Sequence, residues 1–323
     1  MVSLNSCWVP DTLSIAGDRC APGLNQRRLI GGSSMADIKF PEYRDYYSSR
    51  VEVNDAMAAL LVGSKLAAHT LSLTAGSTAT LGQLFPGVEH ISRYNMKSDL
   101  ARNFLGNADH YIASVAVPYA LATHEDFVMR MIDLIENEGK AILTNGKAVK
   151  AWNMHAVLFD SCGEVQPEDW IQTFHVLRET RNCITHAGGR VDQQLRDSIA
   201  NMGPTARAGW QNINNGASPE ALEGADGGLV LTAEHVFTAF AVTKCLGRKI
   251  NALLGRRLEP LAWARIAVTD FDSATTKAKN STTWRRSLIG YVKMMYATAP
   301  IAETHLEQAA RELGLWTIPN WSK

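Results

Sequence analysis

An arginine and a histidine stand five residues apart in the run RNCITH, residues 181–186. Arg181 stays charged at physiological pH and can hold a phosphate through paired hydrogen bonds, and His186 can exchange protons near neutral pH. The amide of Asn182 can orient either side chain. These groups suit RNA cleavage in which a ribose 2′-hydroxyl attacks the adjacent phosphate, His186 transfers protons and Arg181 stabilises the extra charge on the phosphorane. The run therefore predicts a catalytic site that needs no metal ion and no cofactor.

A predicted helix positions this run. Pro167 suits the first helical position, the acidic residues 168–169 suit the positive end of the helix dipole, and the glycine pair at 188–189 ends the helix. Arg181 shares its stripe with apolar residues only, which are Trp170, Phe174, Leu177 and Ile184. Because an unpaired buried guanidinium is costly, Arg181 has to reach solvent, pair with a carboxylate or bind an anion.

The other polar residues of this helix lie on a second stripe, about 120–140° round from Arg181. This stripe consists of His175, Glu179, Asn182 and His186, and Arg178 lies between the two stripes. A polar stripe is most often a solvated face. Arg178 and Glu179 are therefore supporting candidates for the site, behind Arg181, His186 and Asn182.

The reaction needs an acid and a base, whereas the run offers one histidine. Arg181 and His186 also stand about 140° apart on an ideal helix. A working site therefore requires either a helix end between these residues or a second subunit that contributes its own copy of the run. The second arrangement predicts a two-fold homodimer with the runs facing each other.

Glu125 interrupts the apolar face of an earlier predicted helix. It shares a stripe with Leu121, Val128, Ile132 and Ile135. One interpretation is that its carboxylate pairs with Arg181 and orients the guanidinium. The other is a glutamate at the helix edge that reaches solvent, and the sequence leaves both interpretations open.

The run resembles the motif of the HEPN superfamily, in which an arginine, a polar residue and three variable residues precede a histidine. Residues 177–180 (LRET) resemble the usual lead-in, and residues 187–192 (AGGRVD) resemble the glycine-containing exit. The resemblance covers about residues 100–255, with amphipathic helices before the run and an apolar helix after it. It implies an all-α, HEPN-like antiparallel helical bundle.

Many members of this superfamily are metal-independent endoribonucleases of toxin–antitoxin, abortive-infection and CRISPR-associated systems. The resemblance thus implies an RNA substrate, a role as a bacterial antiviral-defence or toxin effector, and an antitoxin or a defence-system protein as partner. Other members are non-catalytic dimerisation or binding modules, and this alternative stays open. A third interpretation is an all-α scaffold in which Arg181 forms a structural salt bridge.

The composition excludes several other classes of protein. The 323 residues carry 32 lysines and arginines and 32 acidic residues, so no global field attracts nucleic acid or an anionic membrane, and any RNA contact is local. The five cysteines are widely spread without a Cys-x-x-Cys pair, which argues against a disulfide framework and a zinc knuckle. Without a secretory signal or an apolar run of about 18 residues, the expected location is the cytoplasm.

Three segments are expected along the chain. Residues 1–49 lack periodicity and predict a poorly ordered tail, in which the GGSS before Met35 is either a flexible linker or a ribosome-binding sequence translated ahead of the true start. Helical patterns predict a domain at 50–255 and a C-terminal helical extension at 256–323. Residues 201–228 are rich in glycine, proline and asparagine and predict a long loop. No alternating strand appears, so the predicted fold class is all-α.

Overall fold

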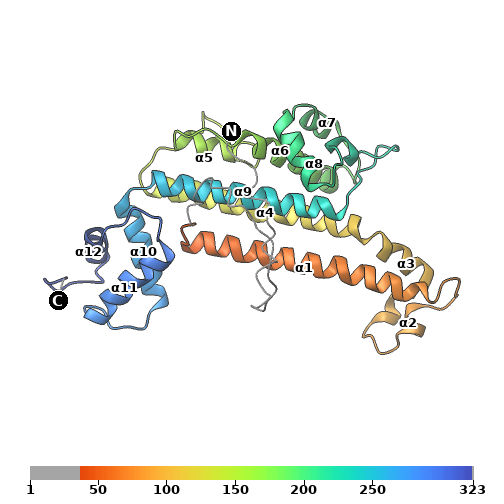
Figure 1. Cartoon of the computed structure of the whole chain (residues 1–323), viewed down its shortest axis with the longest axis horizontal. Coiled ribbons are helices and arrows are strands. Elements are labelled where there is room, and N and C mark those ends of the chain that lie inside the picture. Colours follow the sequence, from red (N-terminus) through yellow and green to blue (C-terminus); the bar gives the residue numbers. More distant parts are fainter. Residues whose placement is uncertain (1–36, 322–323) are drawn as a thin grey trace, which may run out of the picture. The chain divides into compact units, whose positions relative to one another are not determined.

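The computed structural model describes residues 37–321, and every regular element of this part is a helix (Figure 1). In the described chain β-pairing is limited to isolated bridges. The all-α prediction is therefore confirmed. None of the helices in residues 37–321 is long and apolar enough to cross a membrane.

The chain forms two compact units that interleave along the sequence. Within the described range the first unit comprises residues 37–49, 124–167 and 244–321, and the second comprises 50–123 and 168–243. The division falls within the long helices, which are α1 (Pro41–Ser72), α4 (Ala108–Asn137) and α9 (Ala233–Arg257). The units therefore do not follow the predicted boundary at residue 255.

The second unit contains the helix that carries the run. This helix is α6 (Glu168–His186), and it packs against α7 (Gln193–Ala200) and α8 (Pro204–Ile213), with the short η4 (Pro219–Leu222) beside them (Figure 1). The same unit contains α2 (Leu81–Leu84), η3 (Ile91–Tyr94) and α3 (Ser98–Gly106). The predicted start and end of α6 are confirmed.

The predicted loop at residues 201–228 is wrong. This stretch contains α8 and η4, each of which begins at a proline that suits the first helical position. Ala206 and Trp210 are buried four residues apart on one face of α8. Burial of this face outweighs the weak helix propensity of the surrounding glycine and asparagine residues.

The first unit contains α5 (Met154–Ser161) and the three C-terminal helices α10 (Pro260–Ala274), α11 (Thr282–Met295) and α12 (Glu303–Glu312). α10 packs against both α11 and α12 (Figure 1). Aromatic rings fill the space between them: the ring of Trp284 lies 5.4 Å from that of Phe271 and 6.2 Å from that of Trp316. The prediction that the C-terminal extension is helical is confirmed.

The prediction of a tail at residues 1–49 is wrong for residues 41–49, and residues 1–36 lie outside the described residues. Pro41 begins α1, and Phe40, Tyr43 and Tyr46 are buried around this helix start. The backbone of Ile38 donates to and accepts from the side-chain amide of Asn251, at 2.9 and 2.7 Å. These contacts order residues from 37 onward. The proposed start at Met35 lies outside the described residues.

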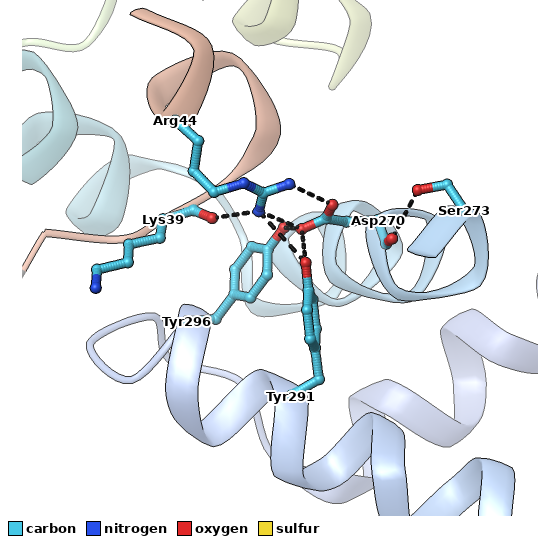
Figure 2. A network of polar contacts seen from close by, with 6 residues as sticks. All are labelled: Lys39, Arg44, Asp270, Ser273, Tyr291 and Tyr296. Carbon is cyan, nitrogen blue, oxygen red and sulfur yellow. Dashed lines mark hydrogen bonds and ion pairs between the residues drawn. The ribbon is translucent and has the colours of Figure 1, made fainter. Parts of the chain in front are cut away.

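A buried carboxylate ties α1 to α10 and α11 within the first unit (Figure 2). Asp270 accepts two hydrogen bonds from the guanidinium of Arg44, both 2.8 Å, and one each from the hydroxyls of Tyr291 (2.8 Å) and Tyr296 (2.7 Å). Burial alone would raise the pKa of Asp270, but these donors outweigh burial, so the pKa lies below its ordinary value. Asp270 is therefore ionised and fully satisfied in the core.

Tyr46 lies in a close-packed contact between α1 and α9 in the first unit. Its ring stacks on Phe127 at 4.3 Å, and its hydroxyl shares a 2.9 Å hydrogen bond with Nδ1 of His124. Nε2 of His124 in turn shares a 2.9 Å hydrogen bond with Nε2 of His155. On its other side the ring of Tyr46 lies against Gly247, where an added Cβ would be 2.6 Å from Cε1.

Replacing Asp270 with asparagine should destabilise the protein in a pH-dependent way. The change removes the charge that Arg44 pairs with, and we expect a loss of about 2–3 kcal/mol at pH 7. Because the pKa of Asp270 is depressed in the fold, its stabilisation is present above the unfolded pKa of about 3.9 and is lost as pH falls through the folded pKa. Urea unfolding of both proteins should give a difference that shrinks below about pH 4.

The matched control for this test is Asp272→Asn. Asp272 pairs with Lys279 at 3.1 Å, and both side chains are partly exposed, so its loss should cost less than about 1 kcal/mol. Equal effects of the two substitutions would contradict the buried network.

Gly247→Ala should destabilise the protein by about 1–2 kcal/mol, because overpacking against the fixed ring of Tyr46 exceeds the helix propensity that alanine adds. Gly290→Ala in α11 is the control, since no heavy atom lies within 4 Å of its added Cβ, and we expect a gain of up to about 1 kcal/mol. Thermal unfolding with a urea series measures both. A Gly247→Ala protein as stable as Gly290→Ala would contradict this close contact.

Candidate functional site

The helix α6 presents the two stripes in different environments. Trp170, Phe174 and Leu177 are buried, and Arg181 is half-buried further along the same stripe. This confirms that a guanidinium interrupts the packing face of the helix. On the second stripe Glu179 is buried, whereas His186 is exposed.

Glu179 is the buried centre of a polar cluster next to Arg181. Glu179 is only 4% exposed to solvent. One carboxylate oxygen accepts from Nη2 of Arg178, and the other accepts from Nδ2 of Asn182 at 2.8 Å. This contact occupies the amide nitrogen of Asn182 and fixes the orientation of its carbonyl oxygen. The interpretation of the stripe as a solvated face is therefore wrong for Glu179.

His175 lies one turn before Glu179 and interacts electrostatically with Arg178 and Glu179. Burial lowers the pKa of His175, and the positive charge of Arg178 lowers it further. Nδ1 of His175 and Nε of Arg178 are buried without a hydrogen-bond partner among the described residues. Burial and the charge of Arg178 thus disfavour protonation of His175, whereas Glu179 and Glu168 act in the opposite direction.

His186 is the last residue of α6 and faces solvent. The chain then turns through Gly188 and Gly189, whose φ angles of 61° and 76° lie in the left-handed region that favours glycine. The amide of Gly189 donates to the carbonyl of Cys183 at 2.9 Å, which closes the helix end. The glycine pair thus sets where α6 stops and leaves His186 at its exposed edge.

The segment after His186 is held by residues 223–229, nearly all of which belong to the end of the stretch predicted to be a loop. The backbone of Leu229 donates to the carbonyl of Gly189 at 2.7 Å, and that of Val191 donates to the carbonyl of Gly227 at 3.0 Å. Nε and Nη2 of Arg196 pair with both oxygens of Glu223 at 3.0 and 2.6 Å. These contacts fix the exit from α6 within the second unit.

α6 continues without a break from Arg181 to His186. The helix end that one subunit would need between these residues is therefore not present. Their separation stays at the value of a regular helix, about 140°. Of the two arrangements that the sequence leaves open, the first is not found in α6, and the second subunit stays a prediction.

Glu125 is half-buried on α4 between Leu121, which is fully buried, and Val128, which is also fully buried. The predicted interruption of an apolar face is therefore confirmed. Glu125 belongs to the first unit and Arg181 to the second. Pairing between their side chains stays a prediction.

The described chain contains no group of three or more histidine, cysteine or acidic side chains arranged to hold a metal ion. Three of the histidines outside α6 make buried structural contacts. His124 and His155 are at most 2% exposed and bond to each other, as described above. Nδ1 of His235 accepts the backbone N–H of Thr232 at 2.9 Å at the start of α9, and burial lowers its pKa to about 4.

No family model, curated protein or solved structure matches the chain. The resemblance to the HEPN superfamily therefore rests on residues 177–192 and on their placement at the end of α6. The candidate site consists of Arg181 and His186, with Asn182 held by Glu179, which also pairs with Arg178.

Substitution of Glu179 by glutamine should destabilise the fold by about 2–3 kcal/mol, because Arg178 then loses the carboxylate that neutralises it in a mostly buried position. Glu168→Gln is the matched control on the same helix: Glu168 is exposed, and its loss should stay within about 0.5 kcal/mol. Urea unfolding at pH 7 measures both. If the two variants are equally stable, the buried charge pair does not support α6.

Proposed function

We propose that the protein is a metal-independent endoribonuclease of the HEPN type, with a role as an antiviral-defence or toxin effector of bacteria. The observation that carries the proposal is the arrangement along α6. A half-buried Arg181 is followed by an amide that the buried Glu179 orients, and then by an exposed His186 at the helix end. An anion-binding group and a proton-transfer group are thus held on one rigid element.

The chemistry follows from these groups. The 2′-oxygen of the ribose forms a bond to the adjacent phosphorus while a base removes its proton. The bond between phosphorus and the 5′-oxygen breaks, and an acid protonates that leaving oxygen. The guanidinium of Arg181 stabilises the negative charge that develops on the phosphorane, and His186 transfers one of the protons. The products are a 2′,3′-cyclic phosphate and a 5′-hydroxyl.

The second proton transfer calls for a second copy of the run. The unbroken helix between Arg181 and His186 favours a site that two subunits share over a site within one chain. A two-fold axis would bring one Arg181 and one His186 from each subunit to the same RNA backbone. We therefore propose that the active form is a homodimer and that RNA binds across it.

The alternative is a non-catalytic HEPN module that uses the same surface of α6 to dimerise or to bind a protein. The polar cluster around Glu179 would then serve only to stabilise the helix. RNA cleavage by the purified protein separates the two functions.

The test measures cleavage of a labelled single-stranded RNA in the presence of a chelator. Wild-type protein should cleave. Arg181→Ala should lose about 10²–10³-fold in rate because it removes the charge stabilisation, and His186→Ala about 10²–10⁴-fold because it removes a proton-transfer group. Circular dichroism confirms that each variant is folded.

Two exposed residues outside the site provide matched controls. Arg130 pairs with Asp126 at 2.9 Å on the surface of α4, and His69 is exposed on α1. Arg130→Ala and His69→Ala should cleave at the wild-type rate. If wild type and all variants are equally folded and equally inert, the ribonuclease proposal is rejected in favour of the non-catalytic module.

A further inference from the structure

An exposed apolar stripe runs along α3 and the first half of α4 in the second unit. It consists of Leu100 and Phe104 on α3 and Tyr111, Val115 and Tyr119 on α4, which are 48%, 45%, 51%, 62% and 46% exposed. The rings of Phe104 and Tyr111 lie 5.9 Å apart, so the residues of the two helices are continuous. Tyr111, Val115 and Tyr119 follow at intervals of four, which places them on one face of α4.

This part of α4 carries no charge. Between Asp109 and Glu125 the sequence contains no lysine, arginine, aspartate or glutamate. A helix face that remains in water normally carries charged residues, and a helix that is apolar on all sides is normally covered. The stripe is therefore a surface built to be covered.

The α4 part of the stripe is symmetric about Val115. A tyrosine lies four residues before it and another four residues after it, and alanines stand seven residues away in both directions, at 108 and 122. If two copies of α4 cross antiparallel at a two-fold axis through Val115, Tyr111 lies opposite the partner's Tyr119. Each ring thus finds an identical partner ring, and the two Val115 side chains meet at the axis.

A two-fold axis also explains why the stripe is uncharged. Residues close to such an axis face their own copies, so any charge there would meet a like charge. A surface for a different protein has no such restriction and commonly carries charges complementary to those of its partner.

The exposed area has the size that such an interface needs. Five large side chains, each about half exposed, leave on the order of 400–500 Å² of surface, given about 150–250 Å² for an aromatic side chain. A standard interface buries about 800 Å² on each partner, and its apolar part is about 65% in homodimers. The stripe would supply most of that apolar part.

We infer that this stripe is the interface with a second copy of this chain, packed antiparallel on a two-fold axis at Val115. This inference rests on the proposed function, because the proposed RNA-cleaving site needs a homodimer and the stripe is the surface that would join its two subunits. The evidence for the surface itself comes from α3 and α4.

The test is the mass of the full-length protein in solution, measured by light scattering at micromolar concentration. Wild type should have twice the chain mass of 35.4 kDa. Val115→Glu and Val115→Lys each place like charges at the axis and should each be monomeric, with a dissociation constant raised about 100-fold or more. An equimolar mixture of the two variants should return to the dimer mass, because opposite charges then meet.

Val165→Glu is the matched control, since Val165 is 91% exposed and lies outside the stripe, and this variant should stay dimeric. A monomeric wild type overturns the inference and assigns the stripe to another occupant. So does a Val115→Glu protein that stays dimeric, or a mixture that stays monomeric. RNA cleavage measured on the same samples distinguishes the two proposals. If the wild-type dimer depends on Val115 but cleaves no RNA, the interface is supported and the ribonuclease function is rejected.

Discussion

A buried carboxylate has to find positive and hydrogen-bonding partners, and Glu179 finds both on α6 itself. Arg178 supplies the charge and Asn182 the amide. The side chains of Glu179 and Asn182, on either side of Arg181 in the sequence, are thus held in place. The arrangement of the run follows from this constraint, because any other rotamer of Asn182 would leave a buried charge under-satisfied. The first unit uses the same device at Asp270, where Arg44 and two tyrosines satisfy a buried carboxylate.

The helix α6 is regular from Arg181 to His186. A regular helix holds the side chains of Arg181 and His186 about 140° apart. This separation supports the proposal that a second subunit completes the site. The uncharged stripe on α3 and α4 offers a surface on which that subunit can dock, and it belongs to the same unit as α6.

Periodicity and capping residues predicted α6 well, because Pro167, the acidic first turn and the glycine pair mark both of its ends. The burial of Glu179 could not be predicted, since a helical wheel assumes one buried face, whereas α6 packs against both α7 and α8. α8 was missed because its glycines and asparagines hide the buried pair Ala206 and Trp210. The start of α1 was missed because its main polar contact, from Arg44 to Asp270, spans 226 residues of sequence. Pairing between Glu125 and Arg181 remains a prediction.

The central claim is that the ribose 2′-hydroxyl is the nucleophile and that the site needs no metal ion. The most direct measurement identifies the end groups of RNA cleaved in chelator, together with a substrate in which one ribose carries no 2′-hydroxyl. We predict 2′,3′-cyclic phosphate and 5′-hydroxyl ends, and no cleavage after the deoxyribose. Ends with a 3′-hydroxyl and a 5′-phosphate, cleavage after the deoxyribose, or RNA that stays intact would contradict the account.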